Sequence, residues 1–251
     1  MRFSTRTVRA LAVLAALAAS VCAADAMTVR PLAVDLQTSG RGMNQIISVQ
    51  NTSDAAIPVE LSVEGLTIDS QGPHPSGKDP GDLVVFPPQA LIQPGQTQTF
   101  RIQYVGDTSL TLSKHYYIKV AQLPVTLPQG QSGIQLLYNF QVLASVGPEG
   151  AKPAMHVLSA AIAKDHDGKP APLITIANDS ATYGYVSRGE LHVAETDASG
   201  HEIFSQNYSS AELQQKLGMG LVDGGQQRQF MLPVVLPSAD GTVSAHFTLK
   251  N

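Results

Sequence analysis

Residues 134–146 have the sequence IQLLYNFQVLASV, in which every second side chain is apolar. All seven even-numbered positions are apolar, whereas only two of the six odd-numbered positions are. A period of two is typical of a β-strand that buries one face. At about 3.3 Å per residue this strand would be roughly 43 Å long, well beyond the usual five or six residues.

This apolar row allows two interpretations. In the first, the strand is central and its even face fills the core of a β-sandwich. In the second, the strand is an edge that offers its apolar row to another protein. Residues 133–147 contain neither a charge nor a proline, the features with which sandwiches usually protect an edge. An edge of this kind predicts a partner strand or self-association of the chain.

The rest of the chain is also strand-like. Residues 57–63 and 98–105 alternate in polarity, and glycine and proline clusters separate the apolar runs. We expect an exposed loop at 69–82 and one short helical turn at 210–217 with Ser210 as its N-cap. Residues 147–153 contain two glycines and two prolines, which is typical of a domain boundary. The sequence predicts an all-β protein with domains at 27–147 and 148–251.

The first 26 residues have the features of a secretory signal peptide. Three arginines lie within residues 2–9, residues 10–24 are apolar apart from Ser20, and small residues stand at 24 and 26. This pattern predicts export to the periplasm and cleavage after Ala26. The apolar run is shorter than the roughly 20 residues that a membrane span needs. The only cysteine, Cys22, lies in this leader, so the exported chain has no disulfide.

Charge and motifs exclude several functions. Removing the leader leaves 13 basic and 19 acidic residues, which disfavours nucleic-acid binding. The chain has no Gly-x-Ser-x-Gly, no His-Glu-x-x-His and no glycine-rich phosphate loop. We therefore expect that the protein is not an enzyme and that it binds no cofactor or small-molecule substrate. Residues 165–168 begin like a calcium loop, but the twelfth position is Ile176 instead of Glu, so we expect a hairpin turn and no metal.

Three stretches resemble the periplasmic chaperones of the chaperone–usher pilus pathway. They are IISVQNT at 46–52, VFPPQALIQPGQTQTFRI at 85–102, and the alternating strand that ends at Pro148. The resemblance implies two immunoglobulin-like β-sandwich domains set at an angle like a boomerang. It also implies a chaperone that lends the long strand of its first domain to an incomplete pilus subunit, which is donor-strand complementation.

The resemblance further implies site residues and partners. By position, the lent side chains are Ile134, Leu136, Tyr138 and Phe140. Family members hold the subunit's C-terminal carboxylate with an Arg in the first strand and a Lys in the long strand. Here Leu143 stands near the place of that Lys, which leaves Arg30 and Lys119 as the candidate anchor. The implied partners are pilus subunits and an outer-membrane usher.

Two other functions are alternatives. A secreted two-domain adhesin or pilus structural subunit would carry an unpaired N-terminal donor strand, but residues 28–36 are short and contain Pro31. A carbohydrate-active enzyme on a sandwich scaffold would need paired carboxylates on adjacent strands, and the sequence does not locate such a pair.

Overall fold

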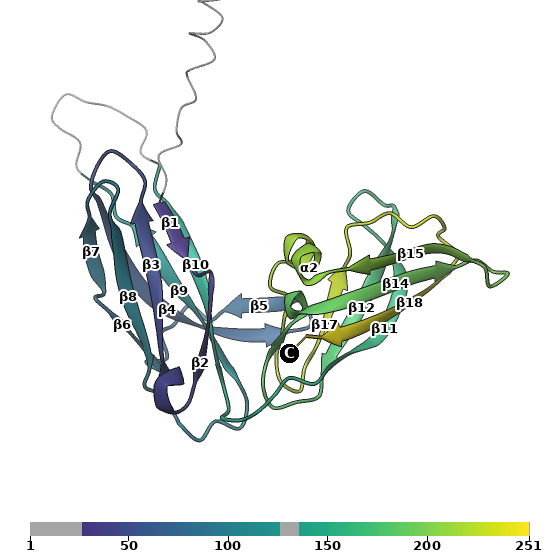
Figure 1. Cartoon of the computed structure of the whole chain (residues 1–251), viewed down its shortest axis with the longest axis horizontal. Coiled ribbons are helices and arrows are strands. Elements are labelled where there is room, and N and C mark those ends of the chain that lie inside the picture. The colour runs from purple at the N-terminus through teal and green to yellow at the C-terminus, as the bar shows by residue number, and fades with distance from the viewer. Residues whose placement is uncertain (1–26, 126–135, 251) are drawn as a thin grey trace, which may run out of the picture.

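The strands form two β-sandwiches that meet at an angle, as the computed structural model shows (Figure 1). The structure describes residues 27–125 and 136–250, so the signal peptide expected at 1–26 lies outside the described residues. Strands before Pro148 build the first sandwich, and strands from Met155 onward build the second. The predicted fold class, two immunoglobulin-like sandwiches arranged as a boomerang, is confirmed.

The first sandwich consists of two facing sheets. One sheet has four strands and the other has six. In spatial order, the first sheet contains β1 (Met27–Arg30), β3 (Asn44–Asn51), β8 (Thr97–Tyr104) and β6 (Leu83–Phe86). The second contains β2 (Ala33–Gln37), β10 (Asn139–Gly147), β9 (Lys114–Gln122), β4 (Ile57–Asp69) and β5 (Gly72–Pro75), with β7 (Gln89–Ile92) also paired to β4; a 3-10 turn, η1 (Gly40–Met43), precedes β3.

Alternating side chains build the core between these sheets. Apolar residues of period two point inward on both sheets because successive side chains of a strand face opposite sides. Ile47, Phe100, Ile118 and Val142 are all fully buried there. The even face of residues 134–146, expected to fill the core in the first interpretation, is fully buried among the described residues only in its C-terminal part, at Val142, Ala144 and Val146.

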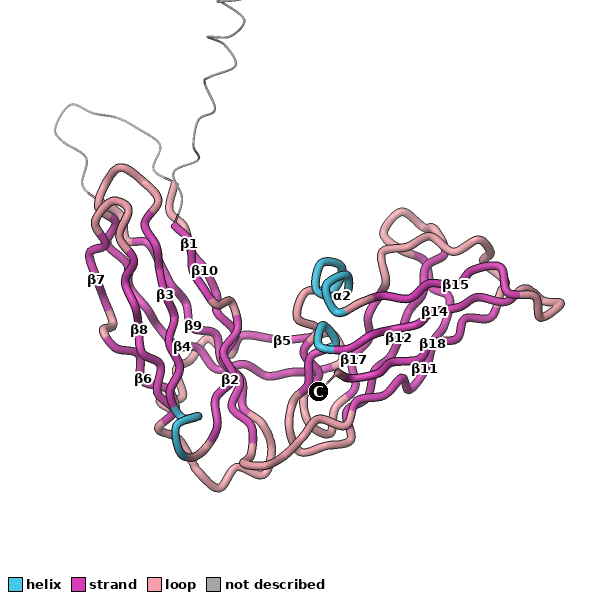
Figure 2. Tube along the Cα trace, viewed as in Figure 1, coloured by secondary structure: helices cyan, strands magenta, loops and turns pink. Residues whose placement is uncertain are grey.

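The second sandwich packs two three-stranded sheets (Figure 2). A capping box begins its helix: Ser209 Oγ accepts from the backbone of Glu212, whose carboxylate accepts from the backbone of Ser209. The N-cap is therefore Ser209 and not Ser210. The elements are β11 (Met155–Lys164), β12 (Pro170–Asn178), β17 (Gln227–Met231), β15 (Glu202–Tyr208), β14 (Gly189–Thr196), β18 (Thr242–Leu249), the pair β13 (Gly184–Tyr185) and β16 (Leu221–Val222), η2 (Val186–Arg188) and α2 (Ser210–Leu217).

Two other expectations differ from the structure. Residues 69–82 are not all loop, because β5 pairs with the end of β4 and forms a hairpin, the β4–β5 arm (Ile57–Pro75), that reaches the second sandwich (Figure 1). The long strand is also shorter than expected. β10 begins at Asn139, where its pairing with β9 begins opposite Ala121. In the described part of the chain, no helix is long and apolar enough to cross a membrane.

Candidate functional site

Strand β10 has two halves with different neighbours. Its C-terminal half, from Leu143 to Gly147, lies between β9 and β2. Its N-terminal half, from Asn139 to Val142, pairs with β9 alone, and no other strand of the described chain covers its outer edge. The C-terminal half of the strand is therefore central, as in the first interpretation, and the N-terminal half is an edge, as in the second.

The uncovered edge, Asn139–Val142, presents backbone groups that could pair with another strand. Gln122 N donates to Tyr138 O at 2.9 Å, so the backbone of Tyr138 faces β9. Leu143 N donates to Leu32 O at 3.0 Å, on the opposite side. Because the direction alternates along a strand, the N–H and C=O groups of Asn139 and Gln141 face the uncovered edge.

The even side chains pass from the core to the surface along this segment. Val142 is fully buried, Phe140 and Tyr138 are half-buried against the same core, and Leu136 is 74% exposed. Ile134, also predicted to be lent, lies outside the described residues. The row therefore continues the core of the first sandwich outward, where a partner's apolar groove could extend it.

The two predicted anchor cations lie on different sheets. Arg30 ends β1, opposite Ser48, is exposed, and has no ion-pair partner among the described side chains. Lys119 lies on β9, opposite Gln141 of β10, and its ammonium group is paired with the carboxylate of Glu64. Among the described residues, no hydrogen bond or ion pair joins Arg30 and Lys119.

The carboxylate of Glu64 is the ion-pair partner of Lys119. The Glu64 side chain is only 8% exposed, and Oε1 accepts from Gly77 N at 2.6 Å. The hydrogen bond from Lys119 is the main cause that lowers the pKa of Glu64, and burial opposes it. Lys119 therefore stabilises a nearly buried carboxylate of its own sheet, a role that the sequence pattern did not reveal.

Leu143, at the place expected for a cation, packs between the two sandwiches. It forms a buried apolar cluster with Tyr185 and Leu221 of the second sandwich. Next to it, Asp35 of β2 accepts from Tyr183 Oη at 2.8 Å and Tyr185 Oη at 3.2 Å, and it is paired with Arg188. This part of the cleft is therefore occupied by contacts within the chain.

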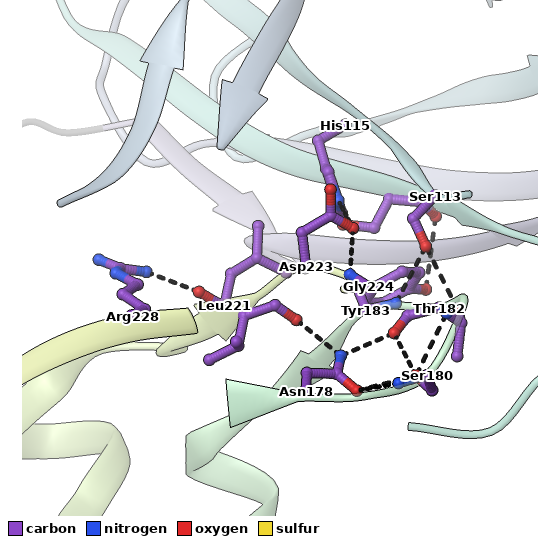
Figure 3. A network of polar contacts seen from close by, with 12 residues as sticks. Ser113, His115, Asn178, Ser180, Thr182, Tyr183, Leu221, Asp223, Gly224 and Arg228 are labelled. Carbon is purple, nitrogen blue, oxygen red and sulfur yellow. Dashed lines mark hydrogen bonds and ion pairs between the residues drawn. The ribbon is translucent and has the colours of Figure 1, made fainter. Parts of the chain in front are cut away.

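A second polar group crosses the interface beside it (Figure 3). His115 of β9 is 3% exposed; its Nδ1 lies 2.9 Å from Ser145 Oγ and its Nε2 lies 3.0 Å from Asp223 Oδ1. Ser113 Oγ accepts from Tyr183 N at 2.9 Å. No sequence pattern marks these residues, since their contacts depend on how the two sandwiches are placed.

The β4–β5 arm makes a third contact with the second sandwich. Gln229 N donates to Ser70 O at 3.2 Å. Arg228 covers the tip of the arm, where the backbone favours glycine: Gly72 has a φ of +133°, and a Cβ there would lie 2.8 Å from Nη2 of Arg228 and push it aside. Arg228 also donates to Leu221 O at 2.9 Å and stacks on Phe230.

Comparison with known proteins identifies the first sandwich. Residues 27–149 match the family described as pili and flagellar-assembly chaperone, PapD N-terminal domain. A search of curated proteins finds no match.

Solved structures share the fold over most of the chain. The class 5 fimbriae chaperone CfaA is 10% identical over 88% of this chain and 98% of its own, with a TM-score of 0.51. The chaperone YadV is 14% identical over 88% of this chain and 91% of its own, also with a TM-score of 0.51. Residues 27–149 are thus a PapD N-terminal domain, and the chain belongs to the pilus-assembly chaperone family as a divergent member.

Proposed function

We propose that this protein is a periplasmic chaperone that captures pilus subunits by donor-strand complementation and delivers them to an outer-membrane usher. The observation that carries the proposal is the uncovered edge Asn139–Val142, which continues directly into the core of the first sandwich. The family match supports the chaperone role. The leader at 1–26, with cleavage after Ala26, would export the chain, whose working parts are 27–147 and 148–251.

Capture of a subunit would need only non-covalent binding to β10. A subunit strand would pair with the backbone groups of Asn139 and Gln141, which removes unpaired groups from both partners. The side chains of Ile134, Leu136, Tyr138 and Phe140 would enter the subunit's groove. Each fully buried apolar side chain contributes about 1.5–3 kcal/mol. No bond is made or broken, so the protein acts as a binding protein and not as an enzyme.

The subunit's terminal carboxylate would still favour a cation. Of the two candidates, Arg30 is available without loss of another contact, because no described carboxylate is paired with it. Lys119 would have to leave Glu64 or hold both carboxylates. We therefore favour Arg30 as the first anchor to test.

Coexpression with a subunit that lacks its last strand tests the function. Leu136→Asp should leave the chaperone folded but abolish capture in a pull-down, because the groove would have to bury an unpaired carboxylate. Leu158→Asp is the matched control: Leu158 is 54% exposed on β11 of the second sandwich, and its variant should capture the subunit as the parent does.

Three results would contradict this proposal. Unimpaired capture by Leu136→Asp would remove Leu136 from the binding row. Equal loss of capture in the Leu158→Asp control would show a general effect of the added charge. Finally, a parent chain that forms dimers through the same edge and binds no subunit would assign the edge to self-association.

A further inference from the structure

Strand β2 marks the end of the uncovered edge. It pairs in parallel with β10 from Ala33 opposite Leu143 to Gln37 opposite Gly147. A strand arriving at Asn139–Val142 therefore meets β2 at Leu143. The position of β2 decides how much of β10 another strand can pair with.

The inner and outer faces of β2 are held by different parts of the chain. Val34 and Leu36 are buried in the core of the first sandwich, 3% and 1% exposed. The outward carboxylate of Asp35 is held by the second sandwich instead, through Tyr183, Tyr185 and Arg188. The second sandwich thus holds β2, the strand that covers the C-terminal half of β10. We call the contacts of Tyr183, Tyr185 and Arg188 with Asp35 the grip.

This grip also includes β10 itself. Asp35 lies opposite Ser145, and Ser145 Oγ lies within hydrogen-bond distance of Tyr185 Oη, at 3.1 Å. The guanidinium of Arg188 lies 4.6 Å from the centre of the Tyr185 ring. This cation–π contact helps to keep the Arg188 guanidinium and the Tyr185 hydroxyl beside Asp35. One group of side chains therefore contacts β2 and β10 at the same level of the sheet.

The two tyrosines are stable donors. Burial is the main cause that raises the pKa of both hydroxyls, and the charge of Asp35 raises it further. Both hydroxyls therefore stay protonated at neutral pH and donate to the carboxylate. Hydrogen bonds to a charged group are stronger than those between neutral groups.

We propose that the second sandwich fixes the length of the lent segment. Tyr183, Tyr185 and Arg188 act as positioning residues: by holding Asp35 they keep β2 on β10 and stop an incoming strand at Val142. The inference rests on the proposed function, because it takes the uncovered edge as the subunit's site. It assigns the second sandwich a part in capture that needs no contact with the subunit.

Amide hydrogen exchange of the purified chain, without subunit, tests the grip. The backbone N–H of Leu143 faces β2, and by alternation so does that of Ser145, whereas those of Val142 and Ala144 face β9. In the double variant Tyr183→Phe/Arg188→Ala, the β2-facing amides should exchange at least about tenfold faster, since a charge-assisted bond and a second donor are lost. The β9-facing amides should keep their rates.

Arg228→Ala is the matched control. Arg228 is also an arginine of the interface, but it contacts the β4–β5 arm and not Asp35. Its variant should leave both sets of amides as in the parent. Should the double variant fail to fold, Tyr183→Phe alone removes one hydroxyl from Asp35, and the same ordering of rates is expected with a smaller effect.

A second measurement uses the captured subunit. In the double variant, Leu143 and Ser145 amides should regain protection on capture, because the subunit strand can now pair beyond Val142. Unchanged rates at these amides in the free variant, equal acceleration of both sets, or no regain on capture would each overturn the inference. The first measurement needs no subunit, so its failure leaves the proposed function standing, whereas a parent chain that captures no subunit would refute the function and leave the result of the exchange measurement unchanged.

Discussion

Substitutions at Leu136 and Val142 should separate binding from stability, although both residues belong to one apolar row. Leu136 is 74% exposed in the free chain, so most of the gain from its burial is still available for a partner. Full burial of a leucine contributes about 1.5–3 kcal/mol, which leaves about 1–2 kcal/mol for capture. Leu136→Ala should therefore raise the Kd for the subunit about 5- to 30-fold. Its free energy of unfolding should stay within about 0.5 kcal/mol of the parent.

Val142→Ala should show the opposite result. Val142 is fully buried in the first sandwich, so its loss leaves a cavity and should lower the free energy of unfolding by about 1–3 kcal/mol. The contribution of Val142 to the affinity for the subunit should be small, because none of its surface remains exposed for the subunit to bury. Urea denaturation measures the stability of each variant, and titration with a subunit lacking its last strand measures the Kd.

One pair of results would refute this reasoning. If Leu136→Ala destabilised the chain and left the Kd unchanged, Leu136 would belong to the chain's own core. If Val142→Ala weakened capture as much as Leu136→Ala at unchanged stability, the boundary between core and lent row would lie elsewhere.

Three further predictions concern charged groups. The pKa of Glu64 is lowered from its ordinary value of 4.5 in the folded chain, so the stabilisation from its ionised form is present above that value and is lost as the pH falls through the lowered pKa. Glu64→Gln should therefore make the free energy of unfolding less dependent on pH on the acid side. Urea denaturation between about pH 3 and 6 measures this, and a pH dependence equal to that of the parent would show that the reasoning is wrong. Both oxygens of buried Glu195 lack a hydrogen-bond partner within the described residues, so Glu195→Met should raise the free energy of unfolding by about 1–3 kcal/mol, and a less stable variant would argue against an unpaired carboxylate. Arg30→Ala should weaken the complex with the subunit about tenfold at unchanged thermal stability, since charge-assisted hydrogen bonds contribute about 1.5–3 kcal/mol; parental affinity would place the carboxylate elsewhere.

Alternation of polarity was sufficient to predict most of the core strands and which of their faces point inward. The pattern around Ile47, Phe100 and Val142 places these residues in the core because burial follows the period of two. The pattern could not predict the β4–β5 arm, since glycine and proline at 72–75 are typical of loops and hide a short strand. It also could not predict where β10 begins, because the alternation of polarity includes Leu136 and Tyr138, whereas pairing of β10 with β9 begins only at Asn139.

The site was only partly accessible to the same reasoning. The apolar row predicts which side chains can be lent, but the uncovered edge exists because β2 pairs no further than Leu143. The contact of Asp35 with Tyr183 joins residues 148 positions apart, and it exists only at the observed placement of the sandwiches. Such long-range polar contacts follow from tertiary geometry and leave no periodic signal.

The β4–β5 arm has a mechanical consequence for the whole molecule. A body that is attached to another at one point can swing about any axis, whereas attachment at two separate points allows rotation only about the line between them. Here the chain at 148–154 is one attachment, the contact of Ser70 and Gly72 with Gln229 and Arg228 is a second, and the group around Asp35 is a third. Three attachments that do not lie on one line leave no free axis of rotation, so we expect the β4–β5 arm to act as a strut and a change in its length to change the angle between the sandwiches.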